Sequence, residues 1–125
     1  MKLWCGVVTE KIAESKAFYT QLFGCEILFE EDWFVLLKLG TSEIGFLLPG
    51  MEGQHPLFQR AYAGEGMWIT IDVTDAQAEL ARFTSLGQAI EQPLRDEPWG
   101  DRHFVLRDPN GIGVDVVQRI TSPME

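Results

Sequence analysis

Basic residues are scarce in this sequence of 125 residues. Ten lysines and arginines stand against nineteen aspartates and glutamates, which gives a formal net charge of -9. Binding to the phosphate backbone of nucleic acids needs a basic surface, so this composition argues against non-specific nucleic-acid binding. An acidic balance of this size favours cationic ligands, and it is also typical of a protein that only keeps a well-solvated acidic surface.

Long apolar runs are absent as well. No run approaches the ~18 apolar residues that a membrane-spanning helix needs, so we expect no membrane partner. The opening stretch, MKLWCGVVTEK, has no extended apolar segment followed by a small-residue cleavage site, which indicates that no signal peptide is present. We therefore expect the chain to be cytoplasmic.

Only two cysteines are present, Cys5 and Cys25, and their spacing fits no metal-binding motif. Cys5 lies in the apolar stretch LWCGVV, where we expect it to be a small buried hydrophobic residue. A disulfide between the two is not expected in the cytoplasm, where thiols are kept reduced.

The sequence does contain one pattern of elements that occurs twice. In the first half, apolar stretches predict a strand, a helix that ends at Gly24, and three further strands. The second half repeats this order, with Thr74 or Asp75 as the N-cap of its helix and Gly87 at the helix end. The stretch Pro109–Gly111 predicts a tight turn between the last two strands.

The repeat also defines the expected domain organisation. We expect a single domain over residues 1–125, with one module at about 1–50, a Gly-rich connector at about 51–66 and a second module at about 67–120. The stretch FVLLKLGTSEIGF, which begins at Phe34, parallels FVLRDPNGIGV, which begins at Phe104.

Three stretches carry a resemblance to a known family: ESKAFYTQLFG, VTDAQAELARFTSLG and PWGDRHFVLRDPNGIGVDVVQ. Together with the repeat, they resemble the vicinal oxygen chelate superfamily of glyoxalases, bleomycin-resistance proteins and extradiol dioxygenases. The resemblance implies an α+β fold in which two tandem βαβββ modules form curved mixed sheets around a cavity. At this length it also implies a homodimer.

The enzymes of this superfamily hold a divalent metal with His, Glu or Gln side chains from the first and last strands of each module. On the resemblance, the first-strand positions fall at Trp68 and at either Trp4 or Leu3, and the last-strand positions fall at Asp115 and near Leu47. An indole has no lone pair for a metal, so only Asp115 is a competent ligand. We therefore expect no metal site and no cofactor, with a divalent metal ion as the alternative.

Alternation along the strands predicts which side chains face the cavity. In the second module, aliphatic residues should meet the helix, which leaves Trp68, Thr70 and Asp72 on the cavity side. On the next-to-last strand, Phe104 and Leu106 should meet the helix, which places His103, Val105 and Arg107 on the cavity side. The same parity places Trp33, Val35 and Leu37 on the cavity side in the first module, with Phe34 and Leu36 in the core.

The two histidines receive different interpretations. His55 lies beside Pro56 in the irregular connector, so we expect a surface residue. His103 and Asp115 lie on neighbouring strands of a hairpin and are expected to be within reach of each other. Three roles stay open for them: a hydrogen-bonded pair that tunes the protonation of the histidine, a ligand-contacting or acid–base role, or a pair of metal ligands.

Four tryptophans is a large number for a chain of this length. Trp4, Trp33 and Trp68 fall at positions that are predicted to line or border the cavity, and Trp99 falls in a loop over its mouth. Each position is also compatible with ordinary core packing. Aromatic walls suit planar or cationic ligands, through stacking and cation–π attraction.

These observations favour a metal-free small-molecule-binding protein that resembles the bleomycin-resistance proteins and serves in antibiotic resistance. Its ligand would be an aromatic or cationic compound, and the expected binding residues are Trp4, Trp33, Trp68, Trp99, His103 and Asp115. One alternative is a glyoxalase- or dioxygenase-like metalloenzyme with an atypical site. A second alternative is a non-catalytic regulatory or interaction module.

Overall fold

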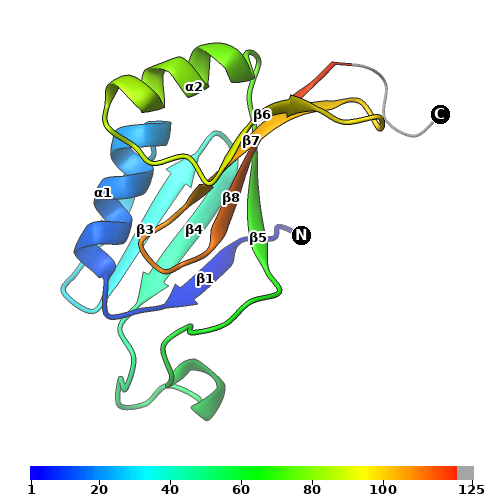
Figure 1. The fold of residues 1–125 in the computed structure, drawn as a ribbon. Helices are drawn as coiled ribbons and strands as arrows, with labels where there is room; N and C mark the ends of the chain where they lie inside the picture. The colour runs from blue at the N-terminus through cyan, green and yellow to red at the C-terminus, as the bar shows by residue number, and fades with distance from the viewer. Residues whose placement is uncertain (121–125) are drawn as a thin grey trace. The chain divides into compact units, whose positions relative to one another are not determined.

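The structure, a computed structural model, describes residues 1–120. The chain divides into two compact units, Met1–Gly64 and a second that begins at Glu65. Each unit is a βαβββ module with a four-stranded mixed sheet and one long helix, as the repeat in the sequence predicts (Figure 1). The α+β fold class expected from the sequence is therefore confirmed. No helix within residues 1–120 is long and apolar enough to cross a membrane.

The first unit has the strand order β1-β4-β3-β2, and β1 runs parallel to β4 while the other neighbours are antiparallel. Its elements are β1 (Cys5–Val8), α1 (Ile12–Phe23), β2 (Glu26–Glu30), β3 (Phe34–Leu39), β4 (Ser42–Leu47) and the short helix η1 (Pro56–Phe58). Helix α1 ends as predicted at Gly24, whose left-handed backbone, φ 69°, lets its N–H donate back to the carbonyl of Thr20.

The second unit repeats this topology with the order β5-β8-β7-β6, and β5 runs parallel to β8. Its elements are β5 (Trp68–Asp72), α2 (Ala76–Ser85), β6 (Gln92–Asp96), β7 (Asp101–Arg107) and β8 (Gly113–Arg119). Asp75 is the N-cap of α2 and its carboxylate accepts a hydrogen bond from the N–H of Ala78. Between β7 and β8, the carboxylate of Asp108 accepts from the N–H groups of Asn110 and Ile112.

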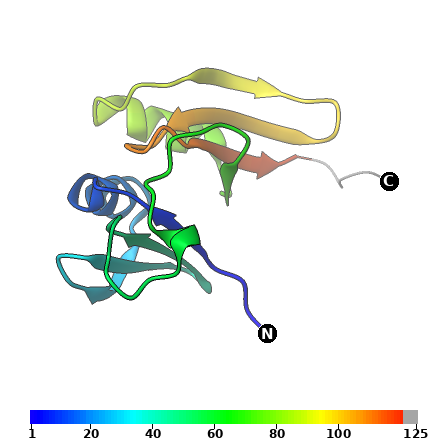
Figure 2. The ribbon, with the colours of Figure 1, turned by 90° about the horizontal axis from the view of Figure 1, so that it is seen from below.

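In the second unit the helix covers one face of the sheet, as Figures 1 and 2 show, and this face holds the core. Phe104 and Leu106 are fully buried on it, and the ring of Phe104 lies 5.8 Å from that of Phe83 on α2. Because side chains alternate along β7, His103 and Val105 lie on the opposite face. The facing predicted for this module is confirmed, and the face away from α2 is called the open face below.

The facing predicted for Phe34 to Leu37 in the first module is wrong. Val35 and Leu37 are buried on the face that packs against α1, because Val35 pairs with Phe46 and the ring of Phe46 lies 5.5 Å from that of Tyr19. Phe34 and Leu36 lie on the other face, the open face of this sheet. The run of four apolar residues that begins at Phe34 has no polar alternation, so the sequence does not indicate which parity faces the helix.

The prediction for Cys5 is also wrong, because its side chain is exposed while Cys25 is buried. Cys5 is the first residue of β1 and pairs with Ile44. It lies on the same face as the buried Val7, but at the end of the strand, where the side chains are exposed. Both thiols are free. Burial raises the pKa of the Cys25 thiol to about 11, so this thiol stays protonated at neutral pH.

Candidate functional site

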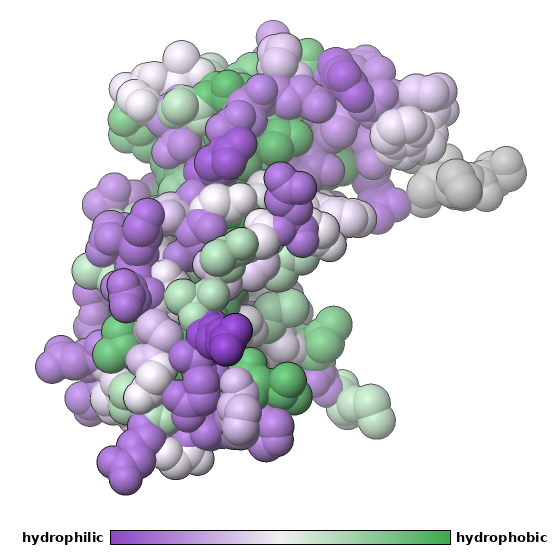
Figure 3. Space-filling model, turned by 60° about the horizontal axis from the view of Figure 1, so that its bottom comes forward, coloured by the Kyte–Doolittle hydropathy of each residue, from purple (hydrophilic) through white to green (hydrophobic). Residues whose placement is uncertain are grey.

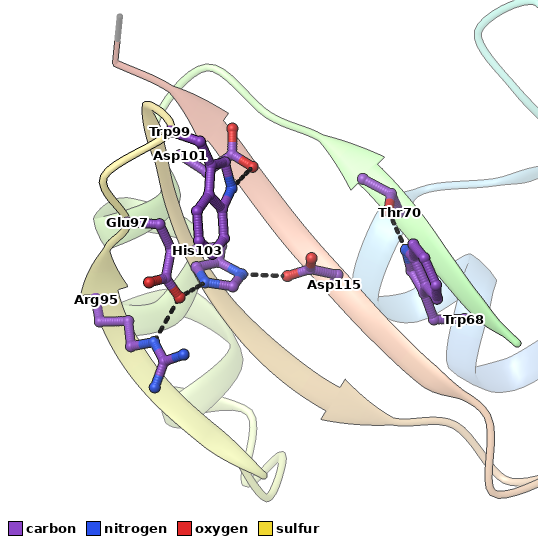
Figure 4. A network of polar contacts seen from close by, with 8 residues as sticks. All are labelled: Trp68, Thr70, Arg95, Glu97, Trp99, Asp101, His103 and Asp115. Atoms are coloured by element: carbon purple, nitrogen blue, oxygen red, sulfur yellow. Dashed lines mark hydrogen bonds and ion pairs between the residues drawn. The ribbon is translucent and has the colours of Figure 1, made fainter. Parts of the chain in front are cut away.

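A buried histidine connects two strands on the open face of the second sheet. The Nδ1 atom of His103 lies 2.7 Å from Oδ1 of Asp115, and its Nε2 atom lies 2.8 Å from Oε2 of Glu97 (Figure 4). His103 comes from the middle of β7, Asp115 from β8, and Glu97 from the turn that follows β6. Only 9% of His103 is exposed, so water does not replace these contacts. The expected contact between His103 and Asp115 is confirmed.

Two carboxylates at the two ring nitrogens determine the protonation state of His103. An ionised carboxylate only accepts hydrogen bonds, so both contacts are satisfied together when both ring nitrogens donate, as they do in an imidazolium. Burial lowers the pKa of His103, but the hydrogen bonds to Glu97 and Asp115 and their charges outweigh it, so the pKa is raised above its ordinary value. The hydrogen bond from His103, followed by that from Arg95 at 2.6 Å, lowers the pKa of the Glu97 carboxyl.

Two tryptophans near this network are held by their own neighbours along the chain. The indole N–H of Trp68 donates to the hydroxyl of Thr70 at 2.8 Å, and that of Trp99 donates to the carboxylate of Asp101 at 2.9 Å (Figure 4). Trp68 is nevertheless 69% exposed and Trp99 is 49% exposed. Each ring therefore has a fixed orientation and an open surface, which reduces the entropy lost when a ligand stacks on it.

A second aromatic group lies on the open face of the first sheet. The ring of Trp33 lies 5.9 Å from that of Phe34 and 6.1 Å from that of Phe29. Trp4 and Phe34 both lie close over Gly45, because a Cβ built at Gly45 would be 2.9 Å from the ring of Phe34 and 3.0 Å from that of Trp4. The absence of a side chain at Gly45 is therefore what allows these two rings to approach the sheet.

The six predicted binding residues separate into two groups. Trp68, Trp99, His103 and Asp115 belong to the second unit and lie around the open face and the turn before β7. Trp4 and Trp33 belong to the aromatic group of the first unit. All four indoles are partly exposed. Figure 3 shows one face of the molecule, on which hydrophobic residues other than tryptophan, in green, also reach the surface among hydrophilic ones in purple. The cavity expected from the resemblance stays a prediction.

The sequence reasoning did not identify four residues of these groups. Glu97 and Arg95 complete the histidine network, and Phe29 and Phe34 complete the aromatic group. The run of three charged residues Arg95-Asp96-Glu97, just before the loop that leads to His103, was the one available signal for the first pair. His55 is exposed as expected, and its Nδ1 accepts a hydrogen bond from the N–H of Leu57.

Strand register identifies the positions at which the enzymes of the resembled superfamily carry metal ligands. The two parallel ladders end alike, because the N–H of Thr9 donates to the carbonyl of Leu47 and the N–H of Val73 donates to that of Val117. Leu47 therefore corresponds to Val117, and the pair Gly6–Gly45 corresponds to the pair Thr70–Asp115. The counterpart of Asp115 is therefore Gly45, which corrects the expected position near Leu47. By the same register Trp4, and not Leu3, is the counterpart of Trp68.

The donor set at these positions does not fit a metal ion. Tryptophan and glycine side chains offer no ligand, and the remaining carboxylate, Asp115, accepts a hydrogen bond from His103. Both nitrogens of His103 are engaged by carboxylates, so neither presents a lone pair. Within residues 1–120, no group of three or more His, Cys, Asp or Glu side chains is arranged to hold a metal.

Curated proteins of similar sequence match about half of this chain. The curated relatives include uncharacterized proteins of Mycobacterium bovis and Mycobacterium tuberculosis, each 33% identical over 64 residues. These matches span 51% of this chain but only 42% and 38% of the two relatives, so the chain matches less than half the length of those proteins.

Solved structures share the fold at low identity. A lactoylglutathione lyase from Agrobacterium tumefaciens matches with a TM-score of 0.76 and 21% identity, over 94% of this chain and 92% of that one. A glyoxalase/bleomycin resistance protein/dioxygenase from Nocardioides matches with a TM-score of 0.79 and 15% identity, over 98% and 85%. TioX from Micromonospora matches with a TM-score of 0.71 and 20% identity, over 95% and 99%.

The family model of the Glyoxalase/Bleomycin resistance protein/Dioxygenase superfamily matches residues 3–116, which is nearly the whole chain. The repeated βαβββ modules and the strand order agree with this match. The chain therefore belongs to the Glyoxalase/Bleomycin resistance protein/Dioxygenase superfamily.

Proposed function

We propose that this protein is a metal-free binding protein for a small aromatic or cationic compound, similar in function to bleomycin-resistance proteins. It lowers the free concentration of its ligand by binding alone, without a reaction. The proposal includes a cytoplasmic location and a homodimeric assembly. No nucleic acid or membrane is a partner in it, in keeping with the net charge of -9.

One observation carries the metal-free part of this proposal. Of the four positions at which the enzymes of the superfamily carry ligands, three are Trp4, Gly45 and Trp68. At Gly45 the position is not only without a ligand but is covered by the rings of Trp4 and Phe34. An ion at this place would have to displace aromatic groups and would gain no donor from them.

The aromatic part of the proposal is supported by the exposure of the tryptophans. Buried tryptophans would indicate core packing, but Trp4, Trp33, Trp68 and Trp99 are between 38% and 69% exposed. Exposed apolar residues that gather into one patch are typical of interaction sites and ligand-binding grooves. Planar compounds gain from stacking on such rings, and cations gain from their π faces.

Thermal stability in the presence of ligands tests this proposal. A compound that binds only the folded state at 100 times its Kd adds about 2.7 kcal/mol of stability. For a chain of this size we expect a rise in Tm of roughly 5–10 °C, measured by calorimetry with a panel of glycopeptides, anthracyclines and other planar or cationic aromatic compounds. A panel in which no compound raises the Tm would contradict the proposal.

The metalloenzyme alternative predicts a different behaviour of the purified protein. It requires the uptake of a divalent metal ion and the turnover of a thiol adduct or a catechol. His103 does not support it as a free general base, because both of its nitrogens already donate to carboxylates. The regulatory-module alternative predicts neither ligand stabilisation nor turnover.

A further inference from the structure

We propose that the open face of the second sheet contains a subsite for a planar aromatic cation, with the ring on Trp68 and the charged group at Asp115. This inference rests on the proposed binding function and specifies the class of ligand for it. The subsite lies within the second unit, so every contact that carries it comes from β5, β7, β8 and the turn before β7.

Trp68 provides a fixed surface beside an uncovered stretch of backbone. Its indole N–H donates to the hydroxyl of Thr70, which orients the ring along β5. Thr70 is also the residue that pairs with Asp115 on β8. Gly113, which pairs with Trp68 on β8, has no side chain, and a Cβ built there would meet only the Cβ of Trp68, at 4.0 Å. The backbone of β8 is thus open to a flat molecule that lies against Trp68.

Asp115 presents an acceptor to this place. Its Oδ1 accepts from His103, and its Oδ2 has no hydrogen-bond partner among residues 1–120. Its side chain is 26% exposed. Thr70 pairs with Asp115 across the parallel strands. Trp68, two residues earlier on β5, is therefore the diagonal neighbour of Asp115, at about 8 Å from the spacing and rise of strands. A molecule of two or three fused rings spans that distance, so one ligand can reach both groups.

The hydrogen-bonding groups around Asp115 favour a cation over an anion. Both N–H groups of His103 are used by carboxylates, so none is free to donate to a ligand. Arg95 on β6 and Arg107 on β7 already form ion pairs. Arg95 pairs with Glu97 at 2.6 Å, and Arg107 pairs with Glu91 at 2.7 Å. The group left free is a carboxylate oxygen, which requires a donor or a positive charge.

Two fluorescent probes with the same ring system separate charge from stacking. Proflavine is a cation at neutral pH and carries N–H donors, whereas acridine is neutral there. Titration of the full chain with each probe, followed by tryptophan quenching and equilibrium dialysis, should give a Kd for proflavine at least about fivefold lower than that for acridine. Asp115→Asn should weaken proflavine about tenfold and leave acridine unchanged.

Asp72→Asn is the matched control, because Asp72 lies on the same open face and on the same strand as Trp68. The substitution removes the same charge, but four residues along β5 from Trp68. It should change the Kd of proflavine by less than about twofold. Equal losses in Asp115→Asn and Asp72→Asn would overturn the subsite, because only the net charge of the face would then matter.

A second variant tests the location without changing charge. Gly113→Val places a side chain over the uncovered backbone, and the ordinary φ of Gly113 and the space around it tolerate this change. Both probes should then bind about tenfold more weakly. Unchanged binding would overturn the placement on Trp68. If both probes bind the unaltered protein equally well, the subsite is wrong and the proposed function stands; if neither binds, both fail for this class of compound.

Discussion

Replacement of His103 with alanine should destabilise the protein by about 2 kcal/mol near pH 6, measured by urea unfolding. The substitution removes the cation that lies between the carboxylates of Glu97 and Asp115, at 2.8 Å and 2.7 Å from its two nitrogens. Asp115 then loses its one hydrogen-bond donor within residues 1–120, and the turn before β7 loses its connection to the middle of that strand.

The size of this loss should depend on pH in a defined direction. Because the pKa of His103 is raised in the folded state, its contribution is fully present below the ordinary value of 6.5 and is lost as the pH rises through the folded value. The pKa of Glu97 is lowered, so its contribution is present above the ordinary value of 4.5 and is lost as the pH falls through the folded value. The network is therefore complete between these two ordinary values.

The difference in unfolding free energy between wild type and His103→Ala should accordingly be larger near pH 6 than at about pH 9. His55→Ala is the matched control, because His55 is exposed and its Nδ1 only accepts a backbone hydrogen bond. It should show no such dependence. A pH-independent difference for His103→Ala would show that the ring is not charged in the folded protein.

Replacement of Phe104 with alanine should cost about 3–5 kcal/mol of stability, the largest effect expected for a single substitution in this account. Phe104 is fully buried, and its ring lies 5.8 Å from that of Phe83 on α2. The truncation removes apolar area from the core and leaves a cavity between the sheet and the helix. Urea denaturation followed by circular dichroism measures the change.

Val105→Ala is the matched comparison, because Val105 is the next residue of β7 and lies on the open face with Asp115. It should cost at most about 1 kcal/mol, since its side chain is only partly buried. The pair therefore tests which face of the second sheet is the core and which is available to a ligand. Equal losses for the two variants would be inconsistent with this assignment.

Most of the fold was predictable from the sequence because its signals are local. Asp75 at the start of α2 and Gly24 after α1 act within one turn of helix, and the structure places both as predicted. The facing of β7 was predictable too, because Phe104 and Leu106 alternate with His103 and Arg107, so one face is clearly apolar.

The facing of β3 was not predictable because the stretch from Phe34 to Leu37 is apolar on both faces. Its parity follows from pairing with Phe46 and from the position of Tyr19, which are distant in the sequence. The parallel drawn between Phe34 and Phe104 is therefore displaced by one residue, because Val35 is the residue that occupies the place of Phe104.

The candidate site was predictable in part. His103 and Asp115 lie on paired strands joined by a short turn, so their contact followed from hairpin register. Glu97 lies in a loop whose path is not coded by periodicity, and its contact with His103 depends on how the turn after β6 folds back. The fixed orientation of Trp68 depends on a side-chain hydrogen bond to Thr70, which strand alternation alone does not indicate.

Metal content tests the central claim most directly. The protein would be purified without a histidine tag, equilibrated with zinc, nickel, manganese and ferrous iron in turn, desalted and analysed by mass spectrometry. With Trp4, Gly45 and Trp68 at three of the four positions, we expect less than about a tenth of an ion per chain. Uptake of about one ion per chain would contradict the account and make a metalloenzyme the better description.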